Sequence, residues 1–135
     1  MSELIISHLK KAILTLEEAL NASLKKPEDK LYRDATIQRF EYTYELSCKM
    51  LRRYLSHFSD SPENIKVMTF PELIRAAWKQ KLLKSSWNIW YSFRDARNKS
   101  NHAYEENLAK QVYVKIPKFL EEASYLYDQM EKKLQ

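Results

Sequence analysis

The feature of this sequence that most restricts its fold is the absence of glycine from all 135 residues. Glycine usually supplies the positive φ angles of hairpins and tight turns, so an all-β fold is difficult to build without it. Only four prolines interrupt the chain, and 44% of the residues are hydrophobic. Long helices joined by polar loops satisfy these constraints. We therefore predict an all-α protein, and a chain of this length should form a single domain, residues 1–135, with an adequate core.

Apolar residues recur at intervals of three and four along most of the chain, which is the spacing of a buried helix face. Helices are predicted at about residues 3–23, 34–56, 69–80, 86–101 and 105–133, and residues 57–68 form the longest connection. Asp34 is the expected N-cap of the second helix, and Thr69 with Glu72 has the pattern of a capping box. Pro117 predicts a kink in the last helix or an earlier break. The expected architecture is an antiparallel up-and-down helical bundle of four long helices and one short accessory helix.

The same periodicity predicts which residues form the core. The expected buried positions are Ile5, Leu9, Ala12, Leu16 and Ala19; Ile37, Phe40, Tyr44, Cys48 (or Ser47), Leu51 and Leu55; Leu73, Ala76 or Ala77, and Trp78; Ile89, Phe93, Ala96 and Ser100; and Val112, Ile116, Phe119, Ala123, Leu126 and Met130. Cys48 is better interpreted as a small core residue than as a nucleophile.

Composition restricts the cellular setting more than the activity. A single cysteine excludes an internal disulfide and argues against a cysteine-based zinc site. The first residues lack the basic region and apolar core of a signal peptide, and no apolar run approaches the ~20 residues that span a bilayer. We therefore expect a cytoplasmic protein with no membrane association. A net charge of +5 would suit a nucleic acid or nucleotide partner, but it does not identify one.

The most chemically distinctive stretch is residues 94–104, which read Arg-Asp-Ala-Arg-Asn-Lys-Ser-Asn-His-Ala-Tyr. Residues four apart share a helix face, so this stretch carries two neighbouring polar stripes, Arg94–Asn98–His102 and Arg97–Asn101. Upstream, the first stripe continues through Trp87, Trp90 and Tyr91. His102 should lie at or just beyond the end of the helix, and Tyr104 should follow it in a mobile loop.

From the residues alone, two interpretations of this stretch remain open. Arg97 and His102 can form a buried polar network that joins two helices, which is the more common use of such residues, or they can form a reactive site. Glu41 and Glu45 on the second helix can likewise belong to a solvated face. Alternatively, one of them orients Arg97 across the core, since a buried arginine needs a carboxylate partner. The tryptophans are more often core or interface residues than a platform for stacking bases.

Several segments together resemble a known family. Arg97 and His102, with four residues between them, resemble the Arg-x4-6-His signature of the HEPN superfamily. Three further segments are similar to one branch of it, the nucleotidyltransferase substrate-binding protein family: Arg39-Phe40-Glu41-Tyr42-Thr43-Tyr44-Glu45-Leu46, Arg97-Asn98 and His102-Ala103-Tyr104. The resemblance covers nearly the whole chain.

The resemblance implies a metal-independent RNase without a cofactor, which dimerises so that two motifs face one cleft. It also implies a toxin whose partner, a minimal nucleotidyltransferase, silences it by attaching AMP to Tyr104. Histidine, with an unperturbed pKa near ~6.5, can exchange protons with the ribose and leaving-group oxygens, and an arginine fork can hold the phosphate. The implied catalytic residues are Arg97 and His102, and the supporting residues are Asn98, Asn101, Arg94 and Glu45.

Three hypotheses for the function therefore follow. The first is an RNase toxin that acts on RNA and is neutralised by a nucleotidyltransferase. The second is a non-catalytic regulatory subunit that binds substrate or nucleotide for that enzyme, as the older family name implies. The third is a helical interaction module unrelated to nucleotides. The chain has no resemblance to a nucleotidyltransferase active site itself. We also expect a homodimer, because the stripe Trp87, Tyr91, Arg94, Asn98 and His102 would otherwise leave a large apolar patch exposed.

Overall fold

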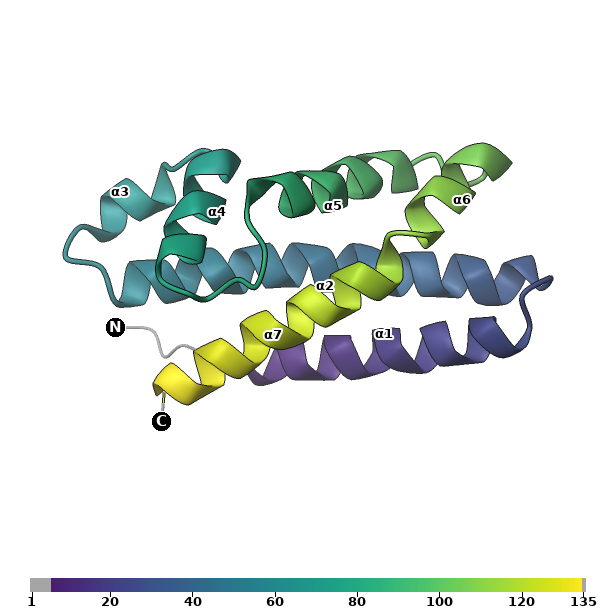
Figure 1. The fold of residues 1–135 in the computed structure, drawn as a ribbon, viewed down its shortest axis with the longest axis horizontal. Coiled ribbons are helices and arrows are strands. Elements are labelled where there is room, and N and C mark those ends of the chain that lie inside the picture. The colour runs from purple at the N-terminus through teal and green to yellow at the C-terminus, as the bar shows by residue number, and fades with distance from the viewer. Residues whose placement is uncertain (1–5, 135) are drawn as a thin grey trace.

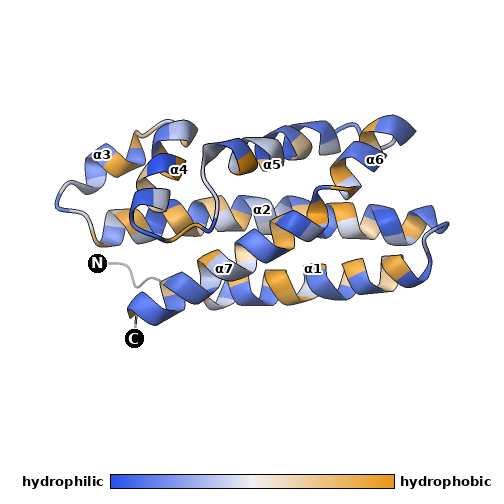
Figure 2. Cartoon of the chain, viewed as in Figure 1, coloured by the Kyte–Doolittle hydropathy of each residue, from blue (hydrophilic) through white to orange (hydrophobic). Residues whose placement is uncertain are grey.

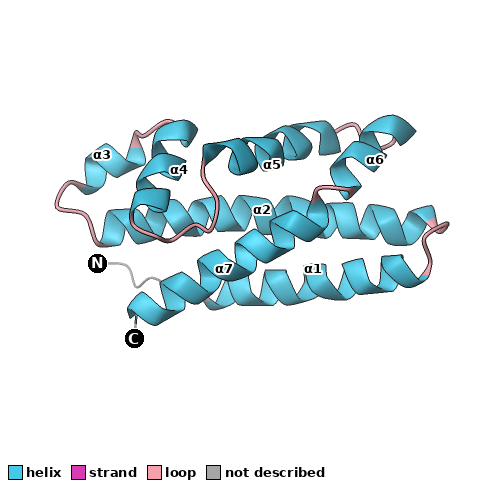
Figure 3. Cartoon of the chain, in the orientation of Figure 1, coloured by secondary structure: helices cyan, strands magenta, loops and turns pink. Residues whose placement is uncertain are grey.

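The computed structural model describes residues 6–134, and all regular structure within them is helical (Figures 1 and 3). The elements are α1 (Ser7–Lys25), α2 (Lys30–His57), α3 (Pro62–Lys66), α4 (Phe70–Lys79), α5 (Trp87–Ser100), α6 (Glu106–Tyr113) and α7 (Ile116–Leu134). The predicted all-α helical bundle is confirmed. The described part of the chain contains seven helical segments rather than five. The predicted connection at residues 57–68 contains a short helix, α3, and the predicted helix at residues 105–133 is broken into α6 and α7.

Helix α2 is the central element of the bundle, and it contacts each of the other helices. In Figure 1 it runs the length of the molecule, with α1 antiparallel to it on one side and α5 on the other. Helix α7 crosses over α1 and α2 and returns toward the end where the chain begins. Hydrophobic residues form stripes along each helix rather than covering it, as expected when each helix buries one face (Figure 2).

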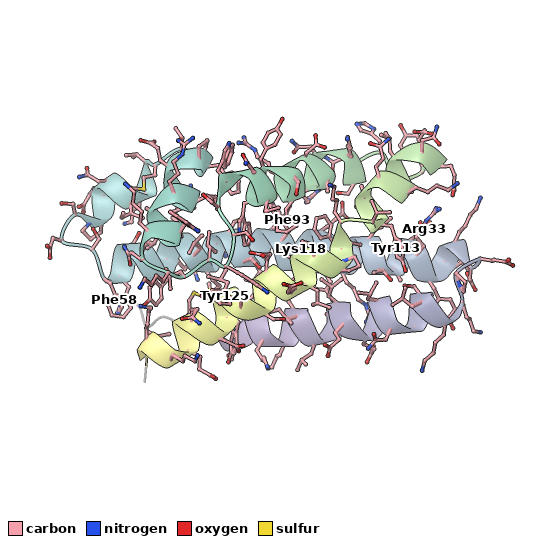
Figure 4. The ribbon with its side chains drawn as sticks, viewed as in Figure 1. Arg33, Phe58, Phe93, Tyr113, Lys118 and Tyr125 are labelled. Carbon is pink, nitrogen blue, oxygen red and sulfur yellow. The ribbon has the colours of Figure 1, made fainter. Side chains whose placement is uncertain are left out.

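Aromatic side chains join the three helices that position the polar stretch. Phe40 of α2, Phe93 of α5 and Phe119 of α7 are fully buried. Phe119 makes edge-to-face contacts with both of the others, with ring centroids 5.1 and 5.2 Å apart. Such pairs stabilise a fold by ~0.5–1.5 kcal/mol each beyond the area they bury. Phe93 points from α5 toward the centre of the bundle (Figure 4), so this cluster fixes α5 against α2.

Most predicted core positions are confirmed, including Leu9, Ala12, Leu16 and Ala19 of α1 and every predicted position of α7. Ile5 lies outside the described residues. On α2 the buried residue is Ser47, and Cys48 beside it is only partly buried.

Two tryptophans were placed wrongly from the sequence. Trp90 is fully buried and the neighbouring Ile89 is not, whereas Trp78 is 48% exposed and the neighbouring Ala77 is fully buried. Adjacent apolar residues differ by ~100° around a helix, so a pattern with two neighbouring candidates does not decide which of them faces inward.

Helix α2 begins at Lys30, four residues before the predicted start. Asp29 is its N-cap, and its carboxylate accepts a hydrogen bond from the Leu31 N–H at 2.9 Å. The predicted cap, Asp34, instead lies within the helix and pairs with the neighbouring Arg33. Both aspartates are acceptable caps by residue type. Asp29, which comes immediately after the turn that contains Pro27, is the N-cap in the structure.

The predicted connection at residues 57–68 contains a short helix, α3. Pro62 occupies its first turn, where a missing N–H costs nothing. The Arg52 side chain of α2 donates hydrogen bonds to the carbonyl oxygens of Ile65 and Met68, at 2.8 and 3.1 Å. These carbonyls lie at the helix end or just beyond it, where intrahelical partners run out, and Arg52 adds to the single-turn backbone bonds that the Ile65 carbonyl accepts from Val67 and Met68. A tertiary contact therefore stabilises this helix, which is why local sequence did not predict it.

Two local predictions are confirmed. Thr69 and Glu72 form the capping box that starts α4, with hydrogen bonds of 2.9 and 3.3 Å. The last predicted helix breaks between α6 and α7, just before Pro117, which lies in the first turn of α7. Within the described residues, none of the helices combines the length and the hydropathy needed to cross a membrane.

Candidate functional site

The polar stretch forms the end of α5 and the turn that follows it. Helix α5 ends at Ser100, and three successive backbone hydrogen bonds then shape the turn. His102 N–H donates to the Lys99 carbonyl at 2.9 Å, Ala103 N–H to Ser100 at 3.2 Å, and Glu105 N–H to His102 at 3.0 Å. His102 therefore lies just beyond the helix, as predicted. The expected mobile loop is instead a hydrogen-bonded turn.

Arg97 is held by two carboxylates of α2. Its Nε and Nη2 atoms donate to Glu45 Oε1 at 3.1 and 2.5 Å, and its Nη1 atom donates to Glu41 Oε2 at 3.2 Å. Glu41 and Glu45 are one helical turn apart and both reach the same guanidinium. The predicted contact between Arg97 and one of these residues is present, and it involves both. Glu41 is the more enclosed partner, because its side chain is 27% exposed and that of Glu45 is 60% exposed.

Two residues of the motif complete the environment of Arg97. Its Nη1 atom also donates to Ser100 Oγ and to Asn101 Oδ1, both at 3.1 Å. Ser100 is buried, and its hydroxyl lies 2.7 Å from Glu41 Oε2 and 2.6 Å from the Arg97 carbonyl oxygen. Its single proton serves one of these acceptors at a time. The sequence indicated Ser100 only as a small inner residue, so its role beside Glu41 was missed.

His102 and Tyr104 form an exposed pair next to this network. The Nδ1 atom of His102 lies 3.4 Å from the Tyr104 hydroxyl oxygen, and the two rings are nearly perpendicular with centroids 6.0 Å apart. Tyr104 is 87% exposed. Among the contacts of the described residues, no hydrogen bond links His102 to Arg97. The motif therefore consists of an anchored guanidinium and a solvent-facing imidazole on neighbouring stripes.

The first stripe of α5 forms a separate surface, here called the α5 stripe: Trp87, Tyr91, Arg94, Asn98 and His102. Tyr91 is 53% exposed, and Arg94 and Asn98 are also exposed. Trp87 is partly buried. The rings of Trp87 and Tyr91 are 5.6 Å apart.

Phe70 of α4 extends the aromatic part of this surface. Its ring lies 5.7 Å from that of Trp87 and 5.2 Å from the Arg94 guanidinium, measured to the ring centroids. Arg94 thus lies beside an aromatic surface, and among the described residues neither Arg94 nor Asn98 is hydrogen-bonded to the network around Arg97. Trp90, expected on this stripe, belongs to the core.

Cys48 lies near this surface but lacks the properties of a nucleophile. Burial raises the pKa of its thiol to about 12, and burial likewise raises the pKa of the neighbouring Tyr44. The thiol is therefore protonated at neutral pH, which suits the predicted packing role. The described residues contain no group of three or more histidine, cysteine, aspartate or glutamate side chains arranged to hold a metal ion.

A large cavity lies away from the motif, at the end of the bundle where the α1–α2 turn meets α6. It has a volume of about 540 Å³, and Arg33, Glu106 and Tyr113 contribute to its lining. Arg33 and Tyr113 lie close together at this end of the molecule (Figure 4).

An ion pair forms part of the cavity wall. Burial alone would lower the pKa of Arg33, but hydrogen bonds to Glu106 and Asp34 raise it. The hydrogen bond from Arg33 lowers the pKa of Glu106. None of the predicted site residues lines this cavity.

The chain is similar to helical proteins that are described by reference to nucleotidyltransferases. Residues 4–132 match the model of the family described as nucleotidyltransferase substrate binding protein like, and the chain belongs to this family. The family predicted from the sequence is therefore confirmed.

Two known proteins that this chain resembles are described, one as a ribonuclease and the other by reference to a nucleotidyltransferase. A Haemophilus influenzae protein named "Probable ribonuclease HepT" is 35% identical over 99 residues, which cover 73% of this chain and 67% of the relative. A solved structure from Haemophilus influenzae, described as the substrate binding domain of a nucleotidyltransferase, has a TM-score of 0.87 and 28% identity. The match covers 94% of this chain and 99% of that one. A Thermus thermophilus structure, also 28% identical, has a TM-score of 0.72 and covers 90% and 98% of the two chains.

Proposed function

We propose that this protein is the partner subunit of a minimal nucleotidyltransferase in a two-component system of the toxin–antitoxin type. In this proposal it is a metal-independent endoribonuclease that acts through Arg97 and His102. The observation that carries the proposal is the anchored Arg97 guanidinium beside the exposed imidazole of His102, in a chain of this family. The relative named as a ribonuclease supports the same activity.

The chemistry follows from what each side chain can exchange. His102 removes the proton of a ribose 2′-hydroxyl, or in its protonated form gives a proton to the leaving 5′-oxygen. An imidazole suits both steps because its unperturbed pKa lies near ~6.5. The Arg97 guanidinium stabilises the charge that develops on the phosphate oxygens. The reaction needs no metal ion, since the attacking oxygen belongs to the RNA itself.

The carboxylates around Arg97 have different roles in this proposal. Glu41 and Ser100 keep the guanidinium in place, because both are partly or fully enclosed and contact each other. Glu45 is more exposed and covers the edge of the guanidinium that a phosphate would bind. Exposed ion pairs contribute only ~0–1 kcal/mol, so an RNA phosphate can displace Glu45 at low cost.

A homodimer completes the site. Much of the α5 stripe is exposed in a single chain, and pairing two copies through it would bring two Arg97–His102 motifs to one cleft. In this arrangement Arg94, Asn98 and Asn101 support RNA binding or the contact between copies. The aromatic side chains Trp87 and Tyr91 would supply the apolar part of the interface.

The nucleotidyltransferase silences the site by transferring AMP to Tyr104. The hydroxyl of this residue is accessible, because the side chain is 87% exposed. The attached nucleotide introduces a negatively charged phosphodiester and a bulky base next to His102. It then competes with RNA for the same groups.

The alternative is a non-catalytic subunit that binds substrate or nucleotide for the nucleotidyltransferase. The observation that favours it is the pairing of the Arg97 guanidinium with two carboxylates. These neutralise the positive charge that would otherwise bind an RNA phosphate. The description of the Haemophilus influenzae structure as a substrate binding domain agrees with this alternative. Membership of the family disfavours the third hypothesis, an interaction module unrelated to nucleotidyltransferases.

An RNA cleavage assay in excess EDTA separates the two proposals. The purified full chain should cut RNA, and Arg97→Ala and His102→Ala should not. His8→Ala is the matched control for the loss of an exposed histidine, and Arg39→Ala for the loss of an ion-paired arginine. No cleavage by the wild type, together with co-purification of a nucleotidyltransferase in a pull-down from the native cell, would favour the non-catalytic subunit.

A further inference from the structure

We propose that His102 has a second role, in which it accepts the proton of the Tyr104 hydroxyl when that residue is modified. The inference rests on the proposed function, since it deepens the modification of Tyr104 described above. It arises from the direct contact between the imidazole Nδ1 atom and the phenolic oxygen at 3.4 Å. The residue that cleaves RNA thereby also assists the reaction that silences it.

The backbone holds the two residues in this relation. Three hydrogen bonds of 2.9–3.2 Å shape the turn from Lys99 to Glu105. Ala103, between the two residues, is partly buried and packs against the core. The Glu105 carboxylate caps α6 through the N–H groups of Asn107 and Leu108, at 3.0 and 3.2 Å. The turn is therefore fixed on both sides, although both rings face solvent.

The two nitrogen atoms of His102 are available for different reactions. Nδ1 faces Tyr104, whereas Nε2, on the other side of the ring, is left for an RNA substrate. Accepting a proton at Nδ1 requires the neutral tautomer whose hydrogen is on Nε2. Accepting one at Nε2 requires the other tautomer. RNA cleavage and modification therefore use the same ring in mutually exclusive states.

The chemical step needs such an acceptor. Tyrosine hydroxyls are protonated at neutral pH because their reference pKa is ~10. In the proposed step the Tyr104 oxygen attacks the α-phosphorus of ATP held by the nucleotidyltransferase. The oxygen–phosphorus bond forms, the bond between the α-phosphorus and the bridging oxygen breaks, and pyrophosphate leaves with its electron pair. The phenolic proton passes to Nδ1 of His102, and the imidazolium later releases it to water.

The test is the rate of AMP transfer by the cognate nucleotidyltransferase with ATP, followed by the mass increase of the full chain. Variants at His102 are compared with wild type, with His8→Ala as the control for an exposed histidine and Tyr104→Phe as the unlabelled control. His102→Ala should label ~10²-fold more slowly, at the low end of the usual contribution of a general base. Added imidazole should restore much of the rate, because the position is open to solvent. Co-purification with the nucleotidyltransferase should be unchanged.

His102→Asn separates proton transfer from orientation, since an amide can bond to the hydroxyl but cannot take its proton at neutral pH. It should label as slowly as His102→Ala. Labelling of His102→Ala at the wild-type rate, or of His102→Asn at that rate, would overturn the inference and leave the proposed function intact. If the wild type itself is not labelled, the proposed modification is wrong and the inference falls with it.

Discussion

Removing the buried carboxylate of Glu122 should destabilise the bundle at the point where α5 begins. Glu122 of α7 is fully buried and accepts hydrogen bonds from the Ser85 N–H at 3.1 Å and the Ser85 hydroxyl at 2.8 Å. Its Oε2 atom also pairs with Lys118 at 3.2 Å. This hydrogen bond raises the pKa of Lys118. Ser85 lies just before α5, so Glu122 anchors the connection that positions the helix carrying the motif.

The expected magnitude follows from these contacts. A hydrogen bond to a charged group contributes ~1.5–3 kcal/mol, and Glu122→Ala removes two from Ser85. Lys118 is 42% exposed and regains water, so the loss of its ion pair adds little to the cost. The partly buried Ser85 N–H left without a partner adds a cost, whereas relief of the buried charge of Glu122 offsets part of the loss. We expect Glu122→Ala to lower the free energy of unfolding by about 3 kcal/mol in total. Glu122→Gln, which retains one acceptor oxygen, should cost about half of this.

Urea unfolding followed by circular dichroism measures this difference. The matched control is Glu121→Ala, because Glu121 is the neighbouring residue, is 49% exposed and pairs with exposed lysines. Glu121→Ala should change the free energy of unfolding far less than Glu122→Ala does, because exposed ion pairs contribute little. If Glu122→Ala costs no more than Glu121→Ala, the carboxylate does not anchor the start of α5, and the reasoning is refuted.

Four further predictions concern the site and its surroundings. His102→Ala should lower the rate of RNA cleavage by ~10²–10⁴ and Arg97→Ala by ~10²–10³, with unchanged circular dichroism; cleavage that survives the loss of both would place the active site elsewhere. Glu45→Gln should tighten RNA binding up to ~5-fold in a filter-binding assay, because a competitor worth at most ~1 kcal/mol is removed; weaker binding would show that Glu45 positions Arg97 instead. Tyr91→Asp should convert the proposed homodimer to a monomer in sedimentation at micromolar concentration, and a monomeric wild type would contradict the proposed interface. Glu106 has a folded-state pKa below its ordinary value of 4.5, so its contribution to stability is present above that pH and is lost as the pH falls further; Glu106→Gln should remove this part of the acid transition, measured by unfolding between pH 6 and pH 3.

The site shows which of its features local sequence patterns can predict and which they cannot. Arg97 and His102 are only five residues apart along the chain, so their spacing could be taken directly from the sequence. The partners of Arg97 are 52 and 56 residues away on α2. A sequence could indicate that a half-buried arginine needs a carboxylate, but not that Glu41 and Glu45 would share it. Ser100 was missed because a small residue on an inner face is equally consistent with simple packing.

The sequence by itself determined that the chain is helical, where most helices lie, and which residues form the motif. These features depend on interactions within a few residues: the absence of glycine, apolar spacing, the capping box at Thr69 and the break before Pro117. Only the tertiary structure decided that Trp90 rather than Ile89 faces the core, that Arg97 is neutralised from α2, and that His102 remains exposed beside Tyr104. The physical reason is that burial and ion pairing depend on the rotation and register of one helix against another. Packing of the whole core sets these, and no single segment encodes them.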